Sequence, residues 1–231
     1  MAGRRRLAAV ASLLLASLFC LALMALRRTV SGTELHSFLV VNLALAWIPF
    51  LLALALYAAD RRGSARLTRG LLGGLWLLFL PNAPYVMTDF IHLGPVAPIP
   101  LWYDAMLFTS FAWTSLALGI GSVLLVHEVV RHRIGDLLSW AALLPVFVLT
   151  SMGVYLGRFV RLNSWDALTR PGRVLHVVAV PLRDPQNHPR LLVVTVIFTL
   201  FLIVTYLVVY TVVELRLAPE ERAAIEDRRR A

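Results

Sequence analysis

Long apolar runs and short polar links alternate along the chain, and this pattern predicts a bundle of membrane-spanning helices. About 20 consecutive apolar residues cross a hydrocarbon core of ~30 Å when they form a helix. The predicted spans are residues 7–26, 37–58, 71–91, 101–127, 137–159 and 191–213. The sequence therefore predicts an all-α, polytopic membrane helical bundle of about six transmembrane helices, organised as one integral membrane domain over residues 1–231.

The third of these runs is interrupted by prolines at its middle. Its unbroken part, Leu71 to Leu80, would rise about 15 Å as a helix, roughly half of the hydrocarbon core. Pro81, Asn82 and Pro84 follow. Each proline lacks an N–H and displaces the carbonyl four residues earlier, and backbone groups freed at membrane depth need protein, water or a ligand. We expect a third helix broken at Pro81–Pro84, either with a polar cavity beside Asn82 or as a plain kink absorbed by helix packing.

The segments outside the spans are less regular. The first run is about 20 residues long, longer than a signal-peptide core, and no Ala-x-Ala site precedes Arg27, so we expect an uncleaved first helix. Residues 160–190 are interpreted as a long extramembrane loop and residues 214–231 as a charged tail. The last span is interpreted as a lipid-facing helix with structural hydroxyl groups at Thr195, Thr199, Thr205, Tyr206 and Tyr210.

Arginine supplies all of the basic side chains, and its distribution predicts a topology. The formal net charge is +9, yet the 22 arginines lie mostly at the ends of apolar runs, which argues against nucleic-acid binding. Fourteen of them fall on the termini and the even-numbered links, and eight on the odd-numbered links. The positive-inside rule then predicts an inner-membrane protein with both termini in the cytoplasm. The single cysteine, Cys20, excludes an intrachain disulfide.

Polar and ionisable residues gather at one membrane face. Span parity places the end of the third span, the start of the fourth and the end of the fifth on that face. Ionisable groups near a membrane are costly unless they are paired. We therefore expect Asp89, Asp104 and Asp166 to form a compact cluster with Arg158 and Arg161.

Several roles are open to these residues. Asp104 is the candidate for an acid or base, and an ion pair with Arg158 or Arg161 is the structural alternative. Either arginine could hold a phosphate or carboxylate, a lipid headgroup or that ion pair. The aromatic residues could line a pocket or anchor the helices at the interface. The candidate ligand-binding residues are Asn82, Tyr85, Asp89, Trp102, Tyr103, Asp104, Arg158, Arg161, Asn163, Trp165 and Asp166.

Metal binding has only a weak signal. Asp89 and His92 are one helical turn apart, but no His-Glu-x-x-His pattern is present. We predict no metal and no cofactor.

The fourth span contains small residues at four-residue spacing, which favour close contact with a neighbouring helix. They are Ser115, Ala117, Gly119 and Gly121.

Three stretches together resemble a known family. They are Pro-Asn-Ala-Pro-Tyr-Val-Met-Thr-Asp-Phe-Ile-His-Leu (81–93), Trp-Tyr-Asp (102–104) and Gly-Val-Tyr-Leu-Gly-Arg-Phe-Val-Arg-Leu-Asn-Ser-Trp-Asp (153–166). In this order they resemble the bacterial domain-of-unknown-function family 1361. The resemblance implies a multi-pass inner-membrane protein, and it carries no activity, cofactor or catalytic residue to this chain.

Three functions follow as alternatives. The first is a binding or transport protein for a small polar or anionic ligand; because six spans without a repeat are few for a transporter, it would act as a homo-oligomer. The second is a membrane-embedded enzyme for a lipid or envelope intermediate, with Asp104 as acid or base and Arg158 and Arg161 on a phosphate. The third is a structural or assembly protein of the envelope. Expected partners are membrane lipid and an unknown small ligand.

Overall fold

The structure is a computed structural model that describes residues 2–162, 169, 170, 172, 179 and 189–230. Every regular element in this part of the chain is helical, and six helices are long and apolar enough to span a membrane. The prediction of an all-α, six-helix membrane bundle is confirmed. The elements are α1 (Ala2–Ser31), α2 (Phe38–Arg61), α3 (Arg66–Phe79), α4 (Asn82–Tyr85), η1 (Val86–His92), α5 (Leu101–Ile134), α6 (Asp136–Tyr155), η2 (Leu156–Val160) and α9 (Pro189–Arg230).

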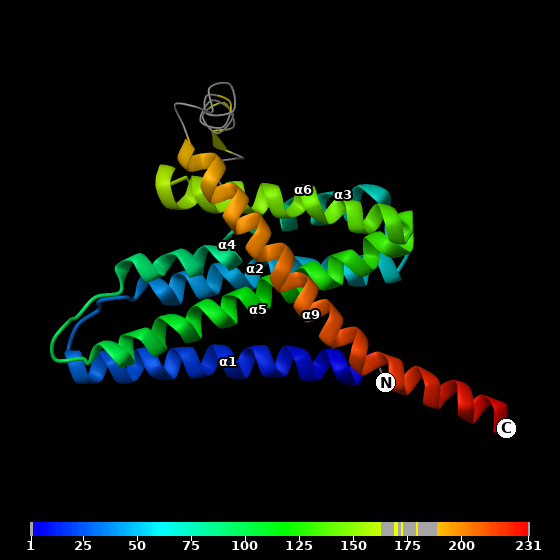
Figure 1. Ribbon diagram of the computed structural model, residues 1–231, viewed down its shortest axis with the longest axis horizontal. Helices are drawn as coiled ribbons and strands as arrows, with labels where there is room; N and C mark the ends of the chain where they lie inside the picture. Colours follow the sequence, from blue (N-terminus) through cyan, green and yellow to red (C-terminus); the bar gives the residue numbers. More distant parts are fainter. Residues whose placement is uncertain (1, 163–168, 171, 173–178, 180–188, 231) are drawn as a thin grey trace.

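The long helices run alternately in opposite directions, so their links fall at two ends of the bundle (Figure 1). One end carries the chain termini, residues 62–65 and Gly135, and is called the terminal end here. The other end carries residues 32–37, residues 93–100 and the end of η2, and is called the motif end. The most deeply buried span is α5, which packs against α1, α2 and α6, while α9 crosses the outside and packs mainly on α6.

Helix α5 extends beyond the predicted fourth span, to Ile134. Its added turns carry Glu128 and Arg131, an i,i+3 pair that lies 3.5 Å apart and favours helix. Gly135 ends the helix at φ +84°, a conformation that glycine adopts without strain, and α6 begins at Asp136. The predicted link of several residues is therefore a single glycine.

The third span is broken where the prolines predict. The α-helical part, α3, ends at Phe79, and a single turn (α4) and a tighter 3₁₀ segment (η1) follow. Local donors satisfy freed carbonyls: Asn82 Nδ2 donates to the Phe79 carbonyl at 2.8 Å, and the Ala83 N–H donates to the Leu80 carbonyl at 3.1 Å. The break is thus a defined structure with its own hydrogen bonds.

Two glycines let neighbouring helices press on this break. A Cβ at Gly153 of α6 would lie 2.4 Å from Pro81 Cγ, and one at Gly119 of α5 would lie 2.8 Å from Ala83 Cβ. Both distances are far below van der Waals contact, so these positions need a residue without a side chain. The close helix contact predicted for the fourth span is present at Gly119.

The interpretation of the last span as wholly lipid-facing is wrong at two positions. Tyr206 is fully buried in the core with Phe147 and Leu202, and Thr199 is buried and donates to Ser151 Oγ at 3.1 Å. A single helix sequence does not show which of its sides meets α6, and this contact decides the burial of α9.

Candidate functional site

A buried ion pair joins the first and fourth spans at the motif end. Arg27, near the end of α1, donates from Nε to Asp104 Oδ1 at 2.7 Å and from Nη2 to Oδ2 at 3.1 Å. The side chains are 0% and 1% exposed. The sequence prediction that Asp104 pairs with Arg158 or Arg161 is therefore wrong. Arg27 follows the first apolar run and lies at the same membrane face as Asp104. This position was the signal in the sequence that could have identified Arg27 as the partner.

His36 lies against this pair in the link between α1 and α2. Its Nε2 is 3.7 Å from Asp104 Oδ2, and its ring meets the edge of Phe108 with 4.9 Å between centroids. The side chain is buried, and neither ring nitrogen has a hydrogen-bond partner in the part of the chain that the structure describes. Burial, and next the positive charge of Arg27, lower the pKa of His36, which favours the neutral imidazole.

A second ion pair forms between Arg158 and Asp89. Nη2 of Arg158 contacts Asp89 Oδ1, Nε donates to Thr88 Oγ1 at 2.7 Å, and Nη1 donates to His92 Nε2 at 3.2 Å. Asn42 of α2 donates to the other oxygen of Asp89 at 2.8 Å. The turn that follows α6, residues 156–160, is thereby tied to η1 and, through Asp89, to α2.

The local backbone explains how Arg158 reaches this position. The chain leaves α6 as a wide π-helical turn, η2, and wide turns of this kind are frequent at functional sites. The turn brings Gly157 against the ring of Tyr85 and places the Arg158 guanidinium 4.4 Å from the centre of that ring. Arg161 ends the turn in the left-handed conformation at φ +60°, which costs an arginine roughly 1–2 kcal/mol.

The two pairs are separate but share an aromatic contact. Phe38 lies between His36 and His92, with ring centroids 5.9 Å and 5.2 Å away. A single compact cluster was expected from the sequence, but Asp104 and Asp89 belong to two separate ion pairs. Arg161 has no ion pair among the described residues, and Asp166 lies outside them.

A cavity of about 650 Å³ lies beside the second pair, between α2, the broken third span and α6. Its volume is within the usual range for small-molecule sites. The polar lining residues are Asn42, Asn82, Tyr85, His92, Arg158 and Arg161. The other lining residues are Leu45, Leu77, Leu78, Pro81, Ile91, Leu149, Met152, Gly153, Leu156, Gly157 and Leu162.

The predicted site residues fall into three groups. Those that line the cavity are Asn82, Tyr85, Arg158 and Arg161. Those that lie elsewhere at the motif end are Asp89, Trp102, Tyr103 and Asp104. Those outside the described residues are Asn163, Trp165 and Asp166.

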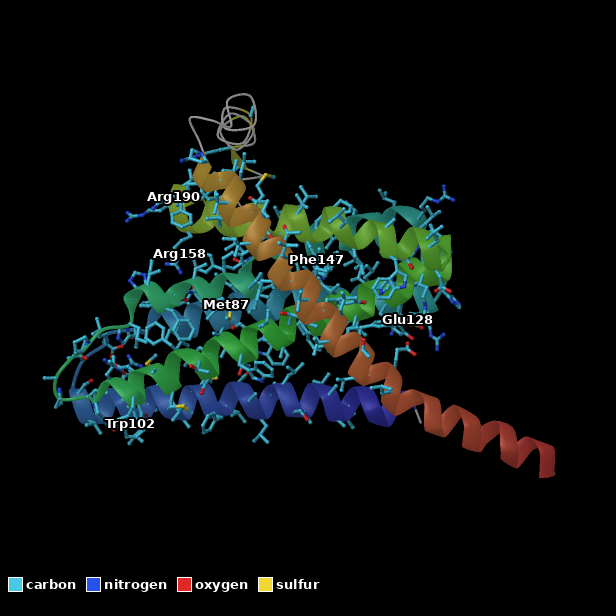
Figure 2. All side chains as sticks on the ribbon, in the orientation of Figure 1. Met87, Trp102, Glu128, Phe147, Arg158 and Arg190 are labelled. Carbon is cyan, nitrogen blue, oxygen red and sulfur yellow. The ribbon has the colours of Figure 1, made fainter. Side chains whose placement is uncertain are left out.

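The second group contributes in different ways. Asp89 is buried behind Arg158, and Tyr103 donates its hydroxyl to the Leu23 carbonyl at 2.7 Å. Trp102 is 67% exposed on the outside of α5, far from Arg158 (Figure 2). This position suits an aromatic anchor at the membrane interface.

The site prediction missed two of the polar lining residues. Asn42 interrupts an apolar run of α2, and His92 follows Asp89 by one turn of η1. A polar residue inside an apolar run was the available signal for Asn42. Both Asp89 and His92 contact Arg158, and the described residues contain no group of three His, Cys, Asp or Glu side chains placed to hold a metal.

The fold and the site define a multi-pass membrane protein with buried ion pairs and a cationic cavity at one end. Residues 41–205 match the family described as proteins of unknown function, domain-of-unknown-function family 1361, and the chain belongs to this family. No curated protein and no solved structure matches the sequence. Arg27 lies outside the matched residues, whereas Asp104 and the whole cavity lining lie inside them.

Proposed function

We propose that this protein binds a small anionic ligand in the cavity beside Arg158, as a membrane binding or transport protein. The observation that carries the proposal is the charge of the lining. Arg158 and Arg161 both line the cavity, and none of its described lining residues is acidic. Two guanidinium groups on the wall, with no carboxylate among the described lining residues, favour an anion.

The arrangement leaves donors free for a ligand. Arg158 has five N–H groups, and its contacts with Thr88, His92 and Asp89 use one on each nitrogen. Two N–H groups therefore have no partner among the described residues. Arg161 is exposed and makes no ion pair among the described residues.

The charge balance supports the same ligand class. Asp89 neutralises Arg158 from behind and holds it in place, so Arg161 supplies the net positive charge of the cavity. Fixed donors that need no rearrangement bind an anion more tightly than mobile ones, because less side-chain entropy is lost.

The alternative enzyme function receives less support. Asp104, its candidate acid or base, does not line the cavity, and Arg27 occupies both of its oxygens. An acid that exchanges protons with a substrate must reach it within hydrogen-bond distance.

We place the protein in the inner membrane with both termini in the cytoplasm and the cavity at the opposite surface. Two of the eight arginines that argue against this orientation, Arg27 and Arg158, are held in ion pairs inside the bundle. The proposed orientation follows the arginine count and the positive-inside rule.

Thermal stabilisation of the purified protein in neutral detergent tests anion binding. The ligands are inorganic phosphate, pyrophosphate, citrate and anionic phospholipids, because a ligand that binds only the folded state raises the melting temperature. We expect at least one of them to stabilise the wild type and Arg161→Asn to lose most of the shift. Asparagine tolerates the left-handed backbone, so this variant removes the charge alone.

Arg190→Gln is the matched control. Arg190 is an exposed arginine at the same end (Figure 2), stacked 4.8 Å over Phe159, and it does not line the cavity. Equal loss of the shift in Arg161→Asn and Arg190→Gln, or no shift with any of these anions, would overturn the proposal.

A further inference from the structure

The cavity has two chemically different zones along the membrane normal. Arg158 and Arg161 lie in and directly after η2, at the motif end. Below them the wall is formed by apolar side chains from three helices, among them Leu45 of α2, Leu77 of α3 and Leu149 of α6. A small inorganic anion would use the first zone and leave the second without a partner.

The apolar zone has the depth of one membrane leaflet. Leu149 precedes Arg158 by nine positions on α6 and η2, which corresponds to about 14 Å at 1.5 Å per residue. Half of a ~30 Å hydrocarbon core is about 15 Å. With the guanidinium groups at the headgroup level, a wall of this length reaches about the centre of the bilayer.

The described residues enclose the cavity only partly. Two of its lining residues, Ile91 and Leu149, are 68% and 44% exposed. Within a membrane span an exposed apolar side chain faces lipid, so a chain in the cavity can continue into the bilayer.

We infer that the anion bound here is the phosphate headgroup of a lipid, whose acyl chain lies along the wall of Leu45, Leu77 and Leu149. This inference rests on the proposed function and names its ligand class. The phosphate accepts hydrogen bonds from Arg158 and Arg161, and the amide groups of Asn42 and Asn82 lie on the same wall. The acyl chain is already out of water in the bilayer, so its contact with the wall orients the lipid. The arginines provide selectivity for a negatively charged headgroup.

Binding of phosphatidic acid, counted by native mass spectrometry from neutral detergent, tests this assignment. Phosphatidylcholine of the same chain length is the neutral lipid control, and inorganic phosphate and pyrophosphate are the free anions. We expect one phosphatidic acid per chain to survive conditions that remove phosphatidylcholine, and millimolar inorganic phosphate to displace little of it.

Two variants test the apolar zone and the cationic zone of the cavity separately. Met152→Trp fills the apolar zone and leaves the arginines in place, and Arg161→Asn removes the guanidinium that has no ion pair among the described residues. We expect each to reduce retention of phosphatidic acid at least tenfold, and Arg190→Gln to retain it as the wild type does. Inorganic phosphate binding that persists in both the wild type and Met152→Trp, without lipid selectivity, would leave the anion site standing and overturn the lipid assignment. Absence of binding by lipid and free anion alike would overturn both.

A measurement on the unaltered protein removes dependence on the folding of Met152→Trp. Phosphatidic acid with a photoreactive diazirine in its acyl chain is incorporated into vesicles of phosphatidylcholine that contain the wild-type protein. Cross-links should concentrate on peptides that contain Leu77, Leu149 or Met152. Cross-links spread evenly over the exposed faces of α1 and α9 would show annular lipid only and overturn the inference.

Discussion

Arg27 and Asp104 face each other with both carboxylate oxygens bound, although they are 77 positions apart in the sequence. Their contact fastens the end of α1 to the first turn of α5, the most deeply buried span. A bidentate arginine–carboxylate pair is more specific in geometry than a single hydrogen bond. The pair therefore sets the register of α1 against the rest of the bundle.

Removal of one partner of this pair should be strongly destabilising. Asp104→Asn leaves the buried Arg27 charge without its counter-charge, and a loss of about 3–5 kcal/mol in the free energy of unfolding is expected. The double variant Arg27→Gln with Asp104→Asn should lose much less than the sum of the single variants, because no buried charge is then left alone. Denaturation in detergent, followed by circular dichroism, measures this cycle.

Arg28→Gln is the control for that cycle. Arg28 pairs with Glu34 at the surface, with side chains 46% and 70% exposed. Such exposed pairs contribute about 0–1 kcal/mol. Additive effects of the two core variants, or an Arg28→Gln loss as large as that of Asp104→Asn, would contradict the role given to the buried pair.

His36 should make the stability of the protein depend on pH below neutrality. Its pKa is lowered in the folded state, so in the window below the ordinary value of about 6.5 the unfolded chain binds more protons than the folded one. The contribution of the neutral His36 to the free energy of unfolding is therefore fully present above pH ~6.5. It is lost as the pH falls toward the pKa of His36 in the folded state. The groups around the ring are Arg27, Asp104 and His92, so the melting temperature should be followed only down to about pH 5, above the ordinary range of a carboxylate.

His36→Asn should flatten this pH profile. Asparagine does not titrate in this range, and it tolerates the left-handed conformation that His36 adopts at φ +70°. His132→Asn, at an exposed position of the terminal end, should leave the wild-type slope unchanged. A slope that survives in His36→Asn would assign the pH dependence to another group.

Gly153→Ala should destabilise the broken third span. The new Cβ would lie 2.4 Å from Pro81 Cγ, and the rigid proline ring cannot move aside without a shift of the helix. Overpacking of this kind costs about 1–3 kcal/mol. The melting temperature measured in detergent reports the change.

Gly74→Ala is the matched control for Gly153→Ala. Gly74 lies within α3, and a Cβ there meets nothing within 4 Å. Alanine is favoured over glycine in a helix interior by up to about 1 kcal/mol, so the control should be neutral or stabilising. An equal loss in both variants would mean that contact with Pro81 is not the cause.

Single-cysteine labelling should show which membrane surface carries the cavity. In a Cys20→Ala background, Thr33→Cys marks the exposed link at the motif end and Ala65→Cys the exposed link at the terminal end. A membrane-impermeant maleimide added to intact cells should label position 33 and spare position 65. The opposite pattern would reverse the orientation inferred from the arginines, and cytoplasmic anions would then be the ligands to test.

The sequence alone determined the number of helices long enough to span a membrane and the position of the break in the third. The length of the apolar runs set the number of spans, and the prolines set the position of the break between α3 and α4. Span parity brought the end of the third span and the end of the fifth to one surface, where the Arg158–Asp89 pair is found. These properties depend on distance along the chain, at 1.5 Å per residue of helix, and they can be read without knowledge of the neighbours.

The tertiary structure decided which side of each helix meets which partner. The pairing of Asp104 with Arg27, the burial of Tyr206 and the cavity between α2 and α6 all depend on the rotation and position of whole helices. In a membrane, lipid tails are as apolar as leucine, so hydrophobic periodicity gives little information about the buried side. Close packing at Gly119 and Gly153 shows which sides of these helices are buried. These contacts form only when the helices pack together, so the sequence of one helix does not reveal them.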